Sequence, residues 1–291
     1  MKLAEKNKGL FFILPWALTF IIFWFFPLLY SLILSLFSTD VIRQSSQFVG
    51  LTNYLKIFRD PDFFTALWNT IIFVAGTIPL TTILALIAAL AVNSRIPLAN
   101  IFKTSLVIPS ITSMVVMALI FSHLYAPGGY IGTLLKIIGF DPPVNGLLLS
   151  EKTALVSIMA MDVLIAFGYY MLLYIAALQN IPENLYEAAE LDGAGGWNKF
   201  RYITLPHLKS MTLFILVINT IRSFQIFTEI FVMTKGGPLN STLTAVYYVY
   251  DVGFVKFDMG YASAAAYVLF IVIAIFSIIQ FKLFQPESAS S

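Results

Sequence analysis

The amino-acid sequence predicts an all-α integral membrane protein with six transmembrane helices and one short cytoplasmic helix. Of its 291 residues, 59% are hydrophobic and 11% are charged, whereas a soluble domain carries about 25% charged residues. Apolar stretches long enough to cross a bilayer, which takes about 20 residues, recur along the chain. The net charge of +2 indicates no nucleic-acid partner, and the lack of cysteine excludes disulfides and thiolate sites.

The first span is predicted over Leu10–Phe37, after the lysines of MKLAEKNKGL at positions 2, 6 and 8. A cleaved signal peptide is the alternative, but the apolar run is too long and no small-x-small cleavage site follows it. We therefore expect a retained span. Basic residues before a first span favour a cytoplasmic N-terminus, and counting these three lysines that side of the membrane carries nine Lys and Arg against seven on the other, a weak bias. With six spans, both termini are expected in the cytoplasm.

Five further spans complete one membrane domain over residues 1–291, because the loops between them are too short to form another domain. Pro109 begins the polar run PSITS and predicts an irregular helix that lines a cavity. For Pro15, Pro27 and Pro79, a static bend is an equally good interpretation. The expected spans are Ala66–Val92, Phe102–Tyr125, Thr153–Leu178, Leu208–Met233 and Tyr261–Phe284.

A polar loop over residues 180–206, which contains YEAAELDGAGGWNKFRYITLP, separates the fourth and fifth spans. Pro182 suits a first helical turn with Asn180 as the cap, and Gly193 suits the left-handed position after a helix. These signals predict a helix over Ile181–Asp192. It is too short to be stable alone in water, so it must pack against something.

Two interpretations of this short helix remain open on physical grounds. It can lie on the bilayer, or it can dock on a cytoplasmic partner. Its Glu183, Glu187 and Glu190 fall on one face, whereas helices that lie on a bilayer usually present Lys and Arg to anionic headgroups. The acidic face therefore favours the docking interpretation.

Ionisable side chains within the spans mark a second candidate site, because such groups usually face a cavity or one another. Asp162 lies in the fourth span, and Arg222, Gln225 and Glu229, at i, i+3 and i+7, are expected to share one face of the fifth. A structural ion pair and a polar translocation pathway are both possible and are compatible. His123 is better explained as an interfacial residue.

The loop also resembles a known motif. Glu187-Ala188-Ala189, three residues, Gly193, nine residues and then Ile203-x-Leu205-Pro206 resemble the EAA loop of permease subunits in bacterial ATP-binding-cassette (ABC) importers. FVGLTNYLKIFRDPDFFTALWNT resembles the entry to the second span of sugar permeases. VMTKGGPLNSTLTAVYYVYDVGF resembles the maltose-permease F-like class. The resemblance therefore covers nearly the whole chain.

The resemblance implies a type I ABC importer permease fold in a bacterial cytoplasmic membrane, surrounded by membrane lipid. It also implies a second homologous permease subunit, two ATPase subunits and an extracytoplasmic solute-binding protein. The implied function is uptake of a sugar or oligosaccharide by alternating access. The residues implied to couple to the ATPase are Tyr186, Glu187, Ala188, Ala189, Asp192 and Gly193. Those implied for the substrate pathway, together with the ionisable residues above, are Ser110, Met114, Asp162, Ile165, Ala166, Tyr169, Arg222, Ser223, Ile226 and Glu229.

The chain contains no G-x-x-x-x-G-K-[ST] motif, so ATP and Mg²⁺ are expected on the partner ATPase and no cofactor, metal or catalytic residue on this chain. The alternative is an ion-coupled secondary transporter that uses Asp162, Arg222 and Glu229. A membrane enzyme is disfavoured, since no H-E-x-x-H motif or catalytic pair stands out. Arg222 suits an anionic sugar or a phosphate ester, unless Asp162 neutralises it, so the identity of the solute stays open.

Overall fold

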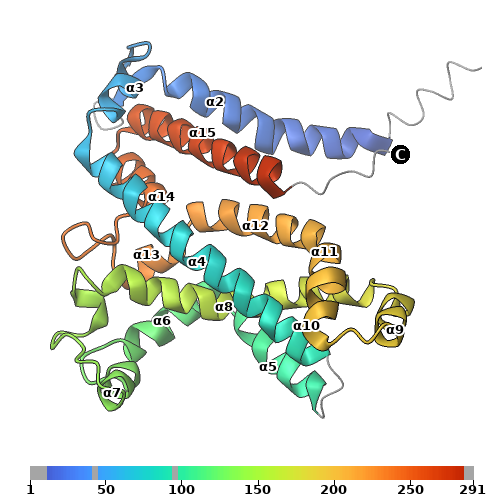
Figure 1. Cartoon of the computed structure of the whole chain (residues 1–291). Coiled ribbons are helices and arrows are strands. Elements are labelled where there is room, and N and C mark those ends of the chain that lie inside the picture. Colours follow the sequence, from blue (N-terminus) through green and yellow to red (C-terminus); the bar gives the residue numbers. More distant parts are fainter. Residues whose placement is uncertain (1–11, 41–44, 94–97, 285–291) are drawn as a thin grey trace, which may run out of the picture. The chain divides into compact units, whose positions relative to one another are not determined.

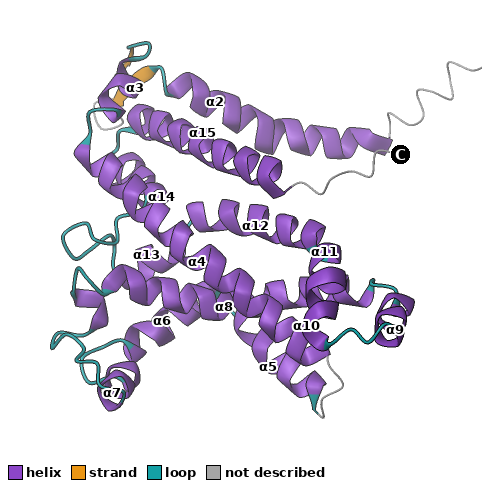
Figure 2. Cartoon of the chain, in the orientation of Figure 1, coloured by secondary structure: helices purple, strands orange, loops and turns teal. Residues whose placement is uncertain are grey.

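The computed structural model describes residues 12–40, 45–93 and 98–284. The lysines at positions 2, 6 and 8, and Arg43 and Arg95, lie outside these residues. Helices dominate the described part, and its one sheet is a two-stranded hairpin in which Phe37 pairs with Phe48 (Figure 2). Five of the described helices are long and apolar enough to cross a membrane, or six spans if one bent pair counts as one.

The elements follow one another in the order shown in Figure 1. The five long segments are α4, α8, α15, the helix over Phe12–Leu34 that includes η1 and α2, and Lys209–Met233, which comprises α12 and α13. The bounds of all the helices and strands are η1 Ile21–Phe25, α2 Phe26–Leu34, β1 Phe37–Asp40, β2 Ser45–Phe48, α3 Thr52–Ile57, α4 Pro61–Asn93, α5 Ala99–Ile111, α6 Met114–Leu124, α7 Tyr130–Ile137, η2 Leu147–Leu149, α8 Ala154–Gln179, α9 Glu183–Leu191, α10 Gly196–Lys199, η3 Phe200–Thr204, α11 Leu205–His207, α12 Lys209–Phe224, α13 Thr228–Met233, α14 Ala245–Tyr250, η4 Asp251–Val255 and α15 Met259–Phe284.

The third expected span, Phe102–Tyr125, is not one helix. It consists of α5 and α6, which meet at an angle of 98°. Pro109 lies within α5, and the chain becomes extended at Thr112 and Ser113, three residues later. The irregularity predicted from the proline is therefore present, and the break itself falls in the following Thr-Ser pair.

The chain divides into two compact units, and the first comprises residues 1–63 and 248–270. Its first span turns into the β1–β2 hairpin, where the Asn53 amide donates hydrogen bonds of 2.9 Å to the carbonyls of Ser35 and Phe37. Asp60 joins three segments of this unit. Its carboxylate accepts hydrogen bonds from the hydroxyls of Tyr248 and Tyr261 and from backbone N–H groups at the start of α4.

The second unit comprises residues 64–247 and 271–291 and is built around α8. Most of the α8 side chains are buried, and α5 and α12 pack against it. Gly168 permits the close approach of α5, since a Cβ atom there would lie 1.9 Å from the Leu106 carbonyl oxygen. Figure 1 shows α9 and α10 near one end of α8 and α6 and α7 near the other.

Candidate functional site

An ionic cluster of Asp162, Arg222 and Glu229 lies within the apolar helices of the second unit. The Arg222 guanidinium donates two hydrogen bonds to the Asp162 carboxylate, with Nη2–Oδ1 at 2.5 Å and Nη1–Oδ2 at 3.3 Å. Asp162 is 2% exposed and Glu229 is 6% exposed. This bidentate geometry compensates the buried carboxylate, which would otherwise be costly in an apolar environment. The structural ion pair considered from the sequence is therefore present.

Glu229 reaches this cluster by a different route from the one predicted. We expected Arg222, Gln225 and Glu229 to share one face of a continuous helix. The structure instead ends α12 at Phe224 and begins α13 at Thr228. The Glu229 Oε1 atom still lies 4.0 Å from Arg222 Nη2. Glu229 therefore lies near Arg222 because of the break between the two helices, and not because the two residues share one face of a continuous helix.

A segment distant in sequence contacts the backbone at the break between α12 and α13. The Thr244 hydroxyl donates a hydrogen bond of 3.3 Å to the Ile226 carbonyl, which has left the helical ladder. The loop before Thr244 is itself held by Asn69, whose amide donates to the carbonyls of Asn240 and Leu243 at 2.8 and 3.0 Å. A distant loop therefore satisfies the backbone that the break exposes, as an irregular helix inside a membrane requires.

The ionic cluster borders a polar cavity of about 240 Å³. Met114, at the start of α6, enters the lining because α5 and α6 bend immediately before it. Phe73 reaches the cavity from α4. The lining residues are Phe73, Met114, Asp162, Arg222, Ser223, Gln225, Ile226, Phe227, Thr228 and Glu229.

The cavity brings together Met114, Asp162, Arg222, Ser223, Ile226 and Glu229 from the predicted substrate pathway. The other predicted residues do not line it. Ser110 donates its hydroxyl to the Val107 carbonyl, Ile165 and Ala166 are buried in the helix packing, and Tyr169 is half-exposed. Their proposed roles in the pathway stay predictions. Tyr169 nevertheless lies on the Asp162 side of α8, because seven residues are about two helical turns.

Sequence reasoning missed Phe73, Phe227 and Thr228 among the lining residues. The chain contains 27 Phe, so a phenylalanine carries no positional signal here. It also missed Tyr170, whose buried hydroxyl donates a hydrogen bond of 3.2 Å to Asn219. Asn219 lies three residues before Arg222 on α12, so this bond helps to hold α8 and α12 in register.

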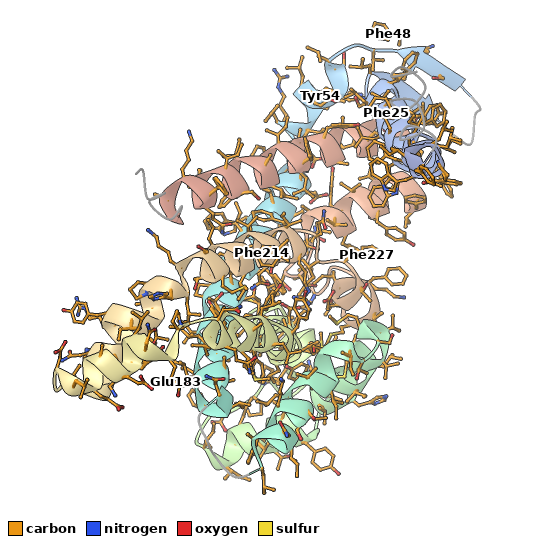
Figure 3. All side chains as sticks on the ribbon, turned by 90° about the vertical axis from the view of Figure 1, so that its right-hand side faces the viewer. Phe25, Phe48, Tyr54, Glu183, Phe214 and Phe227 are labelled. Atoms are coloured by element: carbon orange, nitrogen blue, oxygen red, sulfur yellow. The ribbon has the colours of Figure 1, made fainter. Side chains whose placement is uncertain are left out.

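The second candidate site is the segment after α8. Helix α9 covers Glu183–Leu191, within the predicted Ile181–Asp192, and Gly193 has the expected positive φ of 74°. The predicted cap was wrong: Asn180 donates its amide to the Ala176 carbonyl at the end of α8, and Pro182 occupies the N-cap position. Figure 3 labels Glu183 and Phe227 on opposite sides of this unit.

Helix α9 exposes the surface that a docking partner needs. Glu187, Ala188, Asp192 and Gly193 are exposed, and Tyr186 and Ala189 are partly covered. The Tyr186 hydroxyl forms a hydrogen bond of 2.8 Å with Thr204, which ties α9 to the chain entering α12. Leu191, which sequence reasoning did not single out, is 90% exposed at the end of the helix.

One exposed ion pair closes the loop between α9 and α10. Lys199 Nζ lies 2.5 Å from Glu190 Oε1. This hydrogen bond lowers the pKa of Glu190 below its ordinary value. Glu190 is therefore ionised at neutral pH and Lys199 is engaged with it. The described residues contain no group of His, Cys, Asp or Glu that would hold a metal ion.

Comparisons with known proteins agree on one family. The model of the binding-protein-dependent transport system inner membrane component matches residues 81–288. The chain is 35% identical to the probable ABC transporter permease protein YurN of Bacillus subtilis strain 168, covering 97% of this chain and 98% of that protein. It is 34% identical to the lactose transport system permease protein LacF of Rhizobium radiobacter, covering 94% and 93%.

A solved structure shows the same fold. A chain in the crystal structure of a bacterial alginate ABC transporter, in complex with an alginate pentasaccharide-bound periplasmic protein, matches with a TM-score of 0.86. The match covers 100% of this chain and 98% of that one at 20% identity. The two chains therefore share one fold over nearly their whole length.

Proposed function

Because the chain belongs to the binding-protein-dependent transport system inner membrane component family and has the type I ABC importer permease fold, we propose that it imports a sugar or oligosaccharide. The resemblance seen in the sequence to ABC importer permeases is confirmed. The chain is a multi-pass membrane protein with transporter partners. In our proposal these are a second permease subunit, two ATPase subunits and an extracytoplasmic binding protein that delivers the solute.

One observation carries the mechanism: α8 joins the two candidate sites. Asp162 lies on α8, and α9 begins at Glu183, four residues after α8 ends at Gln179. A displacement of α9 by a docked ATPase is therefore passed along a single helix to the polar cavity. Alternating access requires such a connection, because ATP hydrolysis on one chain must change a site inside another.

The chain itself performs no covalent chemistry in this proposal. ATP and Mg²⁺ bind the partner ATPase subunits, whose dimer closes on ATP binding and moves α9. The coupling residues are Tyr186 through Ala189, with Asp192 and Gly193. Helix α9 and both termini lie in the cytoplasm in this proposal. The polar cavity opens alternately toward the two sides of the membrane.

The ionic cluster favours a neutral solute. Two of the five N–H donors of Arg222 already bind Asp162, so an anionic solute would share the guanidinium with a carboxylate that repels it. Glu229 adds a second carboxyl group to the lining. Sugar hydroxyl groups fit better, because carboxylate and amide side chains accept and donate hydrogen bonds while Phe73 and Phe227 face apolar ring surfaces.

The test compares Gly193→Asp with Gly195→Asp. An added Cβ meets no atom within 4 Å at either glycine, but only Gly193 lies in the predicted docking surface and has a positive φ. With the chain purified alongside its ATPase, we expect Gly193→Asp to reduce ATPase retention and ATP hydrolysis about tenfold, which corresponds to about 1.4 kcal/mol.

Both variants should insert into the membrane to the same extent. Gly195→Asp should keep the retention of the unmodified chain. The proposal fails if Gly193→Asp retains the ATPase and its activity like the unmodified chain. If both variants lost ATPase retention and ATP hydrolysis, the effect would belong to the whole loop and not to the predicted docking position.

A further inference from the structure

An apolar groove between α7 and α8 lies apart from both candidate sites. Its cavity measures about 400 Å³. Ile131 and Leu135 line it from α7, and Val156, Ala160 and Leu164 line it from α8. The last three recur every four residues, so they form one stripe along α8. We call the cavity bordered by these residues, Tyr125, Leu147 and Lys152 the α7–α8 groove.

The groove faces away from the polar cavity. Ala160 precedes Asp162 by two residues, which places the two side chains about 160° apart around the helix. Val156 is 58% exposed and Leu164 is 49% exposed, whereas Asp162 is buried. The α8 stripe therefore does not belong to the ionic cluster or to the predicted pathway.

Two of the uncharged polar side chains at the groove, those of Tyr125 and Thr153, are already engaged within the chain. The Tyr125 hydroxyl donates to the Ser157 carbonyl at 2.7 Å, and the Thr153 hydroxyl donates to the Leu147 carbonyl at 2.6 Å. Their hydrogen bonds leave ring and methyl surface toward the groove. An occupant along the α8 stripe consequently meets apolar atoms.

The charge at the groove sits at one end. Lys152 precedes the first residue of α8 by two positions, and the described residues show no ion pair to it. From Ala154 to Leu164 the helix rises about 15 Å, at about 1.5 Å per residue. This length equals about half of the 30 Å hydrocarbon core of a bilayer. The groove thus combines a cation at a span end with an apolar stripe as deep as one leaflet.

We propose that the α7–α8 groove binds one membrane phospholipid, with an acyl chain along Val156, Ala160 and Leu164 and its phosphate at Lys152. An acyl chain is the occupant that matches an apolar stripe one leaflet long. The lysine supplies charge complementarity for an anionic headgroup. This site is additional to the proposed transport function and does not depend on which solute is carried.

The experiment uses the complete importer, with this chain and its partner subunits, and native mass spectrometry of bound lipid. After delipidation, dioleoyl phosphatidylglycerol and dioleoyl phosphatidylcholine are added back separately. We expect the unmodified complex to bind phosphatidylglycerol about fivefold more tightly, which corresponds to about 1 kcal/mol for one lysine near an anionic headgroup. Lys152→Gln should remove this preference, and Lys136→Gln, on α7 but outside the groove, should retain it.

Ala160→Trp should fill the groove and remove the bound lipid, whereas Ile83→Trp, at an exposed position of α4, should not. Equal lipid binding by both tryptophan variants would overturn the proposal. A photoreactive amino acid at Val156 provides a second measurement in case Ala160→Trp does not fold. Cross-links to phospholipid are expected, and cross-links to the second permease subunit alone would show that a protein covers the groove.

Discussion

At the scale of single residues, the Asp162–Arg222 pair explains how charged groups persist inside apolar helices. The carboxylate is almost fully buried, and the guanidinium satisfies it through two hydrogen bonds. Arg222 itself is 36% exposed through its side chain. Its exposed side borders the polar cavity. The pair is thus both structural and available to a solute, as the sequence allowed.

Replacing Asp162 by Asn should destabilise the chain, because Arg222 would lose its charged partner in a partly buried position. We expect a loss of about 1–3 kcal/mol in the free energy of unfolding, less than for a fully buried pair because Arg222 is partly exposed. Thermal unfolding in detergent measures it. The double variant Asp162→Asn with Arg222→Gln should recover part of the loss, and purely additive effects would contradict an energetic coupling between the two residues.

Asp60 makes the stability of the first unit depend on acid pH. Burial raises the pKa of Asp60, but hydrogen bonds from Tyr248, Tyr261 and the backbone of α4 bring it below the ordinary value of 3.8. Burial and the bond to Asp60 raise the pKa of Tyr248, so its hydroxyl stays a donor at neutral pH. A lowered carboxyl pKa stabilises the folded state at pH values above the ordinary pKa of the group. This stabilisation is lost as the pH falls through the folded-state pKa.

Asp60→Asn should therefore destabilise the chain at neutral pH and weaken its loss of stability on acidification. Melting temperatures measured from about pH 7 to about pH 3 test this. Asp141→Asn, at an exposed position, is the control and should follow the unmodified chain. An unchanged acid dependence in Asp60→Asn would show that other carboxyl groups determine it.

At the scale of elements, the crossing of α5 and α8 depends on Gly168. An added methyl group would lie 1.9 Å from a backbone oxygen of α5, which cannot move without shifting that helix. Small residues allow such close helix contacts in membrane proteins. Gly76 on α4 provides a comparison, because its added methyl group would meet only the Met159 side chain, whose terminal methyl would also lie at 1.9 Å.

Gly168→Ala should cost about 1–3 kcal/mol, the typical result of overpacking a well-packed contact. Gly76→Ala should cost less, because the flexible Met159 side chain can rotate away. The difference in melting temperature between the two variants measures this. Equal effects would mean that α5 shifts as readily as a methionine side chain, contrary to the packing described here.

Most helices were predictable from the sequence because long apolar runs in a chain with little charge have few alternatives. Helix α9 and the positive φ of Gly193 were predictable from local signals. The two helix breaks, between α5 and α6 and between α12 and α13, were harder to predict. Pro109 indicated the first of them, but the second, at residues 225–227, contains neither proline nor glycine and relies on Thr244. Contacts between residues so far apart in sequence leave no local pattern. The aromatic lining of the cavity was unpredictable because, among 27 Phe, a phenylalanine carries no positional signal.

At the scale of the whole molecule, the chain leaves much of its apolar surface for other molecules to cover. The most hydrophobic window of the first span, within Phe12–Leu34, has none of its residues buried by the chain itself. Helix α9 likewise exposes the predicted docking surface. In the proposed importer, lipid covers the first of these surfaces and a partner subunit the second.

The energy source distinguishes that assembly from an ion-coupled transporter. In proteoliposomes containing the complete importer and its loaded binding protein, we expect uptake with ATP and Mg²⁺ on the ATPase side and no ion gradient. Substitution of the P-loop lysine in the ATPase should abolish uptake, because this chain has no phosphate-binding motif of its own. Dissipating proton and sodium gradients is the control and should leave uptake unchanged. Uptake that continued without ATP and followed an ion gradient would assign Asp162, Arg222 and Glu229 to ion coupling, because buried carboxyl groups in spans are the usual carriers of protons.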